Sequence, residues 1–194
     1  MTISGLSTTH ARGVIPLKAD YIPEIAFEHI LGALMPENRL ALFVSLTTGL
    51  RIDDVLSLRR KDIEKTRFTI KEMKTGKSRR VSISKELQEQ LLYCCGRYYV
   101  FEHRTDPKQH RTRQAVYKDL KRACKLFRIS ETLQVSPHSA RKIYAVEAYK
   151  RTAKIATVQK LLNHSNEPVT MIYAMADELT ARHTKRSKLN LPGA

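Results

Sequence analysis

Residues 161–175 read LLNHSNEPVTMIYAM, and they place a tyrosine nine residues after a histidine. Asn-Glu-Pro interrupts the apolar letters between them. This composition is typical of a turn that starts a new helix, because proline fits the first helical turn. The stretch therefore predicts the end of one helix, a turn and a short second helix that carries Tyr173.

The charge of the chain indicates a polyanionic partner. Thirty-five Lys and Arg against nineteen Asp and Glu leave a net charge of +16. Nucleic acid and an anionic membrane surface both suit that charge. The sequence has no apolar run of membrane-spanning length and no signal-like apolar segment after the amino terminus. Nucleic acid is therefore the expected partner, and no membrane is expected.

The cysteines Cys94, Cys95 and Cys124 are an odd number without C-x-x-C spacing. Neither a disulfide framework nor a zinc finger is expected, and the sequence favours a reducing cytosol. The thiols are interpreted as small apolar fillers of helix faces.

The organisation is that of one domain, because no composition shift marks a second. A hydrophobic fraction of 42% in 194 residues suffices for a core. We expect a polar amino-terminal segment over residues 1–20, the main domain over 21–175 and a carboxy-terminal tail over 176–194.

Helical periods cover most of the chain. In the first predicted helix, Pro23 takes the first turn, and one apolar stripe consists of Ile25, Ile30, Leu31 and Leu34. A second helix, over 37–47, is apolar nearly all round and should be central, and Gly49 then breaks the chain. Further helices are predicted over 52–58, 85–99, 112–127, 137–151 and 153–162, around Tyr173 and after Asp177.

The period changes to two after Asp62. Phe68 and Ile70 alternate in one run, Val81 and Ile83 alternate in the next, and KTGK separates the runs. This pattern predicts a β-hairpin with Gly76 in its turn. The fold class is thus mainly α with a small antiparallel β-sheet (α+β).

Arg51 directly follows a glycine turn in TTGLRIDDVLSL, residues 47–58. An arginine at a helix start is commonly solvated, but this one stands between core residues, and a buried guanidinium needs an anion. Asp54 supplies that anion structurally, or it orients Arg51 toward a phosphate.

In VSPHSARKIYAVEAY, residues 135–149, Ser136 is a good N-cap and Pro137 a good first-turn residue. His138 then lies in the first turn and Arg141 on the same face, where a helix start favours an anion. The alternative is a capping segment with two exposed basic residues. The hairpin tip KTGKSRR adds Lys74 and Lys77. These lysines are either exposed to solvent or in contact with a nucleic-acid backbone.

Together these residues resemble the tyrosine recombinases, the phage integrase family, from about Tyr21 to Met175. The family order Arg, hairpin Lys, His-x-x-Arg, His, Tyr recurs as Arg51, Lys74, His138 with Arg141, His164 and Tyr173. The family's Leu-Gly-His-Ser and Thr-x-x-Tyr stretches are matched by residues 162–165 and 170–173.

The chain departs from the family pattern at several positions. Asn163 replaces the usual glycine, and asparagine is the next best residue for a left-handed backbone position. Ala140, Lys142 and Asp54 replace a leucine, a frequent histidine and a frequent glutamate. Many members also carry an amino-terminal helical domain that clamps the DNA, whereas here about twenty residues precede the first helix. The chain is interpreted as a small natural member or a catalytic fragment.

The resemblance implies that Tyr173 attacks a DNA phosphodiester and forms a covalent 3′-phosphotyrosyl intermediate, which another strand's 5′ hydroxyl reseals. Arg51, Arg141 and His164 would hold the phosphate, His138 would help to accept the tyrosine proton, and Lys74 would protonate the 5′ oxygen. Lys77 is the alternative acid. Neither ATP nor another cofactor nor a metal is required.

The function implied is site-specific recombination of double-stranded DNA, with a homo-tetramer on paired sites and a tail that docks on a neighbouring protomer. The cytoplasm is the expected location, on the bacterial nucleoid or for a phage-encoded protein. Two alternatives stay open: a type IB topoisomerase and a DNA-binding regulator that lost catalysis.

Overall fold

The computed structural model describes residues 19–129 and 132–189, with side chains described up to Arg182 in the last helix. The predicted polar segment over 1–20 lies outside this range up to residue 18. The first half of the chain contains α1 (Glu24–Gly32), α2 (Pro36–Thr48), α3 (Ile52–Leu56), a 3-10 turn η1 (Arg60–Ile63), β1 (Arg67–Lys71), β2 (Ser78–Ser82) and α4 (Lys85–Cys94). The second half contains α5 (Arg113–Leu126), α6 (Pro137–Thr152), α7 (Ile155–Leu162), α8 (Glu167–Ala174) and α9 (Ala176–Leu189).

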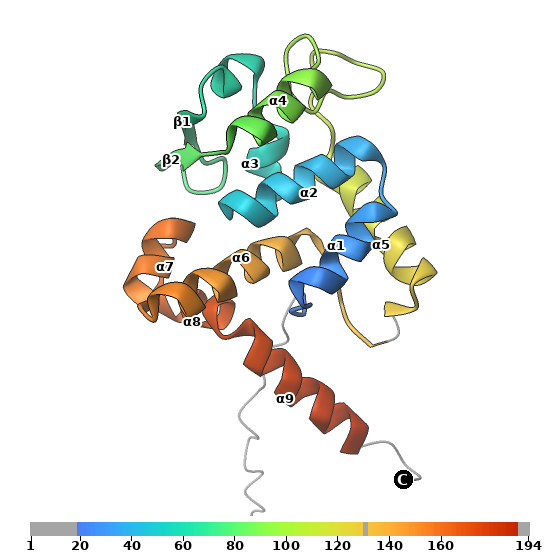
Figure 1. Ribbon diagram of the computed structural model, residues 1–194, viewed down its shortest axis with the longest axis vertical. Helices are drawn as coiled ribbons and strands as arrows, with labels where there is room; N and C mark the ends of the chain where they lie inside the picture. Colours follow the sequence, from blue (N-terminus) through green and yellow to red (C-terminus); the bar gives the residue numbers. More distant parts are fainter. Residues whose placement is uncertain (1–18, 130–131, 190–194) are drawn as a thin grey trace, which may run out of the picture.

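The predicted fold class, mainly α with a small antiparallel sheet, is confirmed. Figure 1 shows α3, α4 and the hairpin on one side of α2, and α6, α7 and α8 on the other. None of the described helices is long and apolar enough to cross a lipid bilayer.

Helices α2 and α6 pack against each other at the centre of the molecule. The predicted central position of this helix is confirmed, since Leu40, Leu42, Val44 and Leu46 are buried and Phe43 is half-buried. Burial of one such side chain contributes roughly 1.5–3 kcal/mol to folding. These helices therefore form a rigid base for the polar groups attached to their ends.

Gly49 ends α2 in the left-handed conformation, with φ of 66°. A Cβ atom at this position would collide with the ring of Tyr144 on α6. Glycine is therefore required twice here, for its backbone angle and for the close approach of α6. The turn at Gly49 sends the chain directly into Arg51 and α3.

The hairpin has the predicted strands and turn. Phe68 lies opposite Val81 in the antiparallel register, and Ile70 and Val81 face the core. Gly76 adopts φ of 66°, and its N–H donates to the carbonyl of Glu72 at 2.8 Å. The turn thus begins at a residue whose side chain is buried, which places the hairpin tip beside the core.

The first predicted stripe was wrong at Ile25, which is 73% exposed. The buried face of α1 follows Phe27, Ile30, Leu31 and, just after the helix, Leu34. These positions have the helical spacing i, i+3, i+4 and i+7, and Ile25 lies out of phase with them.

Three other boundaries were also wrong. Helix α4 ends at Cys94 rather than residue 99, because the carboxylate of Glu102 accepts hydrogen bonds from the N–H groups of Arg97 and Tyr98 at 2.6 and 3.2 Å. Those two N–H groups thereby satisfy their hydrogen bonds outside a helix. Helix α3 stops at Leu56 rather than residue 58. Helix α7 starts at Ile155 rather than residue 153, because Ala153 caps α6 with φ of 51°.

Candidate active site

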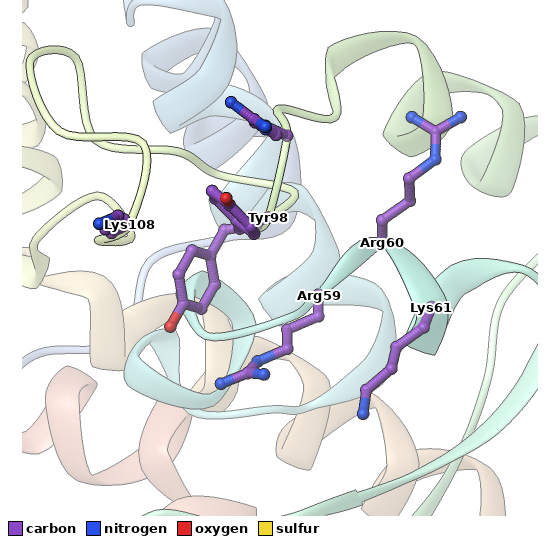
Figure 2. A pocket seen from close by; sticks show the side chains of 7 residues that line it. Arg59, Arg60, Lys61, Tyr98 and Lys108 are labelled. Carbon is purple, nitrogen blue, oxygen red and sulfur yellow. The ribbon is translucent and has the colours of Figure 1, made fainter.

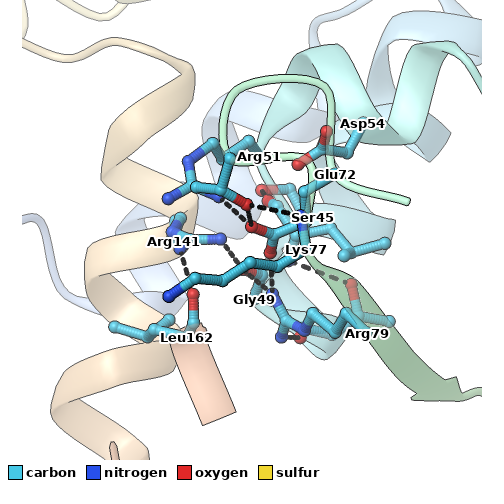
Figure 3. A network of polar contacts seen from close by, with 12 residues as sticks. Ser45, Gly49, Arg51, Asp54, Glu72, Lys77, Arg79, Arg141 and Leu162 are labelled. Carbon is cyan, nitrogen blue, oxygen red and sulfur yellow. Dashed lines mark hydrogen bonds and ion pairs between the residues drawn. The ribbon is translucent and has the colours of Figure 1, made fainter. Parts of the chain in front are cut away.

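Five elements contribute to one polar site: the α2–α3 junction, the hairpin, and helices α6, α7 and α8. Figure 3 shows Arg51, Glu72, Arg79 and Arg141 converging around the carbonyl of Gly49. The structure brings together Arg51, His138, Arg141, His164 and Tyr173, which the sequence had selected from three separate stretches.

Arg51 is the N-cap residue of α3, and its anion is Glu72 rather than Asp54. Its Nη1 donates to Oε2 of Glu72 at 2.7 Å, and the Glu72 side chain is fully buried. The interpretation of Asp54 as the partner was wrong. Asp54 instead accepts a hydrogen bond from the N–H of Met73 at 2.8 Å and so ties α3 to the hairpin.

The two buried carboxyl groups differ in their pKa values. Burial opposes ionisation of Glu72, but hydrogen bonds from Thr75 and Arg51 and the positive charge of Arg51 outweigh burial, so the pKa of Glu72 is lowered. For Asp54, burial prevails over the hydrogen bond from Met73, and the nearby charge of Glu72 adds to it, so its pKa is raised. Glu72 is therefore more readily ionised than Asp54 and is the main negative charge of the site.

Arg141 projects from the first turns of α6 and is almost wholly buried, with 1% of its surface exposed. It donates to two main-chain carbonyls, those of Gly49 and Leu162, the latter at 2.7 Å. Burial, together with the positive charges of Arg51 and Arg79, lowers the pKa of Arg141 to about 9. The guanidinium still carries its charge at neutral pH, and it forms no ion pair with a carboxylate of the described part of the chain.

His138 follows the predicted N-cap, since Ser136 accepts a hydrogen bond from the N–H of His138 at 3.2 Å. Its ring Nδ1 lies 3.5 Å from the phenol oxygen of Tyr173. Although the residue reaches solvent, the surrounding protein desolvates the ring, and together with Arg141 and Arg113 this lowers the pKa of His138. The imidazole is therefore neutral at pH 7 and able to accept a proton.

His164 stands after the left-handed turn at Asn163, whose φ of 52° agrees with the expectation for asparagine. The hydroxyl oxygen of Thr170 lies 3.2 Å from the carbonyl oxygen of Asn166 and 3.2 Å from Nδ1 of His164, so this contact ties the imidazole to α8. Burial and the charges of Arg141 and Arg51 lower the pKa of His164 to about 4.

Tyr173 lies near the end of α8, and its ring meets that of His164 edge-on, with centroids 5.3 Å apart. Burial raises the pKa of Tyr173, although the charges of Arg141 and Arg51 partly oppose it. The phenol is therefore protonated at neutral pH, and it needs a proton acceptor before it can act as a nucleophile.

The hairpin turn presents two lysines. Both are exposed, and Figure 3 shows Lys77 extending toward Arg141 and Leu162. The choice between the two as an acid stays a prediction.

Sequence reasoning missed Glu72, and it named Arg79 only as part of the basic hairpin tip and Lys142 only as a departure from the family pattern, without a role in the site. Arg79 donates to the carbonyls of Thr48 and Gly49 at 2.6 and 3.2 Å, and Nζ of Lys142 lies 5.8 Å from the centre of the Tyr173 ring. The alternation of the strands contained a signal for two of them, because positions 72 and 79 continue the inward faces of Ile70 and Val81. For Lys142 the signal was the histidine that the resembling family frequently has at this position.

The sequence matches the model of the phage integrase family over residues 21–179. Among relatives, it is 31% identical to the probable integrase/recombinase YoeC of Bacillus subtilis over 165 residues, covering 77% of this chain and 84% of that protein. It is 29% identical to the tyrosine recombinase XerA of Saccharolobus solfataricus, covering 84% of this chain and 55% of that protein.

The fold is similar to that of the XerH site-specific recombinase, solved in a post-cleavage complex with its palindromic difH substrate. The TM-score is 0.65 at 20% identity, over 86% of this chain and 52% of the other. The chain therefore belongs to the phage integrase family, and the predicted class, a tyrosine recombinase, is confirmed. It spans about half the length of the XerA and XerH proteins that it matches.

Proposed function

We propose that this chain cuts and rejoins double-stranded DNA as a site-specific recombinase, with Tyr173 as the nucleophile. The observation that carries the proposal is the convergence of a protonated phenol, a neutral imidazole acceptor and two arginines from separate elements. A phenol alone attacks a phosphodiester poorly, because its pKa is near 10 and the phosphate is negative. Arginines that neutralise the phosphate and a base that takes the proton remove both obstacles.

In the proposed reaction the phenol oxygen of Tyr173 bonds to phosphorus while its proton passes to Nδ1 of His138. The bond from phosphorus to the 5′ oxygen breaks, and a hairpin lysine protonates that oxygen. The product is a 3′-phosphotyrosine, and attack by a 5′ hydroxyl of another strand reverses each step. Arg51 and Arg141 stabilise the negative charge that develops on the nonbridging oxygens.

The contribution of His164 depends on its own protonation state, which decides whether Nε2 can donate a hydrogen bond to the phosphate. When Nδ1 donates to the hydroxyl of Thr170, the neutral ring has no hydrogen on Nε2 for a phosphate oxygen, and this is the tautomer that we propose. A bound phosphate raises the pKa of a neighbouring imidazole. We therefore expect His164 to be neutral without DNA and protonated in its presence, when Nε2 becomes a donor.

Access to Arg141 requires a local movement, because this side chain is 1% exposed. The hairpin turn is the expected moving part, since it carries Lys77 toward Arg141 in Figure 3. Displacement of Lys77 by the DNA would make the guanidinium groups of Arg51 and Arg141 accessible to the phosphate. It would also allow Lys74 to approach the 5′ oxygen. Residues 166–168, which are the N-cap and the first two residues of α8, form the second expected hinge, which lets Tyr173 move away from His164.

The active assembly that we propose is a homo-tetramer on paired DNA sites, acting on the nucleoid or encoded by a phage. Helix α9 starts against its own domain: Ala176 is buried, and Thr180 accepts a hydrogen bond from the N–H of Tyr21 at 2.9 Å. The sequence of the tail predicts an apolar stripe of Ala176, Leu179 and Ala181, followed by a basic stretch over 182–188. The stripe is wrong at Ala181, which is exposed, as is Arg182. Figure 1 shows the rest of α9 leading away from the domain, as a segment that docks on a neighbour would. The predicted basic side chains after Arg182 lie outside the described ones.

The test is incubation with a nicked suicide substrate, followed by a denaturing gel. Wild type should give a protein–DNA adduct that survives detergent, disappears on protease treatment and forms in excess EDTA. Tyr173→Phe should bind DNA and give none, while Tyr149→Phe serves as the matched control. An undiminished adduct from Tyr173→Phe would refute the assignment, and strict dependence on magnesium would refute the mechanism.

A further inference from the structure

A second basic concavity lies outside the site described above. This pocket of about 460 Å³ is lined by five cationic side chains and two tyrosines, namely Arg59, Arg60, Lys61, Arg97, Lys108, Tyr98 and Tyr99. Figure 2 shows that these side chains come from two segments, the start of η1 and the loop that follows α4. We call it the Arg59–Tyr99 pocket.

The backbone holds the two segments of the pocket together. Arg59 and Tyr99 form an isolated antiparallel bridge, and the N–H of Val100 donates to the carbonyl of Leu58 at 2.9 Å. The guanidinium of Arg59 lies 5.5 Å from the centre of the Tyr99 ring, and that of Arg97 lies 5.4 Å from the centre of the Tyr98 ring. Such stacking fixes the cations without neutralising them.

The five cations have no carboxylate within ion-pair distance among the residues that the structure describes. The acidic groups beside them bind main-chain donors instead. Glu102 accepts from the N–H groups of Arg97 and Tyr98, and Asp62 accepts from the N–H of Arg59. By contrast, Arg51, Arg111 and Arg113 all have carboxylate partners. The pocket therefore gathers positive charge that an external anion can neutralise.

We propose that the Arg59–Tyr99 pocket binds the phosphodiester backbone of DNA, at phosphates separate from the one that Tyr173 would attack. Arginine, lysine and tyrosine are side chains that commonly contact DNA phosphates. The inference rests on the proposed function, because it needs DNA at the Tyr173 site. It adds a second contact that fixes how far the duplex extends across the protein.

The position of the pocket suits the same DNA. Arg51 precedes α3 and Arg59 follows it, and α3 has five residues. A helix of that length rises about 7.5 Å, and each strand of B-DNA carries one phosphate per roughly 3.4 Å of axis. The pocket therefore corresponds to phosphates a few nucleotides from the scissile one, and it would set the register of the cut.

The test compares Arg97→Gln/Lys108→Gln with a matched double variant on α5, Lys118→Gln/Lys125→Gln. All four side chains are exposed, so both variants should fold. DNA affinity is measured against salt concentration in a Tyr173→Phe background, which keeps the DNA intact. The pocket variant should lower the slope of log K against log salt by about 1 to 2, since each lost phosphate contact removes roughly 0.9. The α5 variant should leave the slope unchanged.

Ethylation interference then locates the contact. The pocket variant should lose interference at phosphates a few nucleotides from the cleavage position and keep it at that position. An unchanged slope and pattern, or an equal loss in the α5 variant, would overturn the inference. Adduct formation by the same variants carrying Tyr173, at saturating protein, separates the two proposals. If adducts form normally while the slope is unchanged, the pocket inference fails and the proposed function stands.

Discussion

The phenol oxygen of Tyr173 and Nδ1 of His138 lie 3.5 Å apart, although 35 residues separate them in the chain. This distance is at the outer limit of a hydrogen bond. Contacts of catalytic groups are commonly long before the substrate binds and shorten in its presence. The N-cap of α6 and the packing of α8 on α6 thus place an acceptor beside the phenol in advance.

His138→Gln should slow adduct formation by about 100-fold or more, because a positioned base contributes roughly 10²–10⁴-fold. The pKa of His138 is lowered, so wild type should keep its rate through neutral pH and lose it only as the pH falls below about 6.5. The variant should lack this acid limb. Single-turnover cleavage of a nicked substrate measures both, and an unchanged rate with an unchanged pH profile would mean that water takes the proton.

Glu72→Gln should destabilise the protein by on the order of 3 kcal/mol, since it leaves Arg51 without its buried counter-charge. The matched control is Asp54→Asn, which should cost less because the pKa of Asp54 is already raised. Because the pKa of Glu72 is lowered in the fold, its contribution is complete above about pH 4.5 and decreases as the pH falls. Urea denaturation measures these free energies, and equal losses in the two variants would contradict the pairing.

His164 should make wild type lose stability in mild acid. Its pKa is about 4 in the fold, against about 6.5 in an unfolded chain, so between these values the unfolded state binds the additional proton. Stability is therefore unaffected at pH 7 and falls by up to about 1.4 kcal/mol per pH unit below about pH 6.5. His164→Gln should remove roughly 2 kcal/mol of the loss between about pH 7.5 and about pH 5. An identical loss in both proteins would show that other groups cause it.

The general acid can be identified with a substrate whose 5′-bridging oxygen is replaced by sulfur, because a thiolate leaves without protonation. Lys74→Ala should be inactive on ordinary DNA and active on the sulfur substrate, whereas Lys77→Ala should not be rescued. Lys77 extends toward Arg141 in this conformation, so the result also tests whether the turn moves when DNA binds. Rescue of Lys77→Ala alone would reverse the assignment.

Deletion of the residues after Asp177 should weaken pairing of sites and strand exchange, while binding to a single site remains. A lower salt dependence is expected from the lost basic residues. Thr180→Val removes the contact with Tyr21 but keeps the helix, and it controls for a local structural effect. A truncated protein that recombines at the wild-type rate, with the same assembly size on DNA, would place the subunit contact elsewhere.

Local signals predicted most of the fold. Gly49, Gly76, Ser136 and Asn163 each mark a turn or cap that glycine, serine or asparagine favours for a defined backbone reason. Errors fell where a tertiary contact competes with the local period. The Glu102 carboxylate ends α4 early, and no pattern in the stretch over 85–99 contains that contact.

The residues of the candidate site could be predicted from the sequence, but the hydrogen bonds and ion pairs that join them could not. Arg51, His138, Arg141, His164 and Tyr173 stand in local motifs, so each was selected from sequence. The partner of Arg51 was not, because Asp54 is close in sequence whereas Glu72 is brought close by the hairpin. Which lysine faces the phosphate depends on the side-chain conformation of a four-residue tip, and periodicity does not determine that.

The carbonyl of Gly49 accepts hydrogen bonds from both Arg79 and Arg141, and a carbonyl carries no net charge. The guanidinium groups of Arg51, Arg79 and Arg141 lie close together, with Glu72 as the ionised carboxylate beside them. Their mutual repulsion destabilises the fold unless an anion binds between them. Small tetrahedral oxyanions such as sulfate should consequently raise the melting temperature of the free protein more than chloride at equal ionic strength. The same ions should slow the reaction by competing for the arginines, so the choice of buffer anion decides whether a preparation is optimised for storage or for activity.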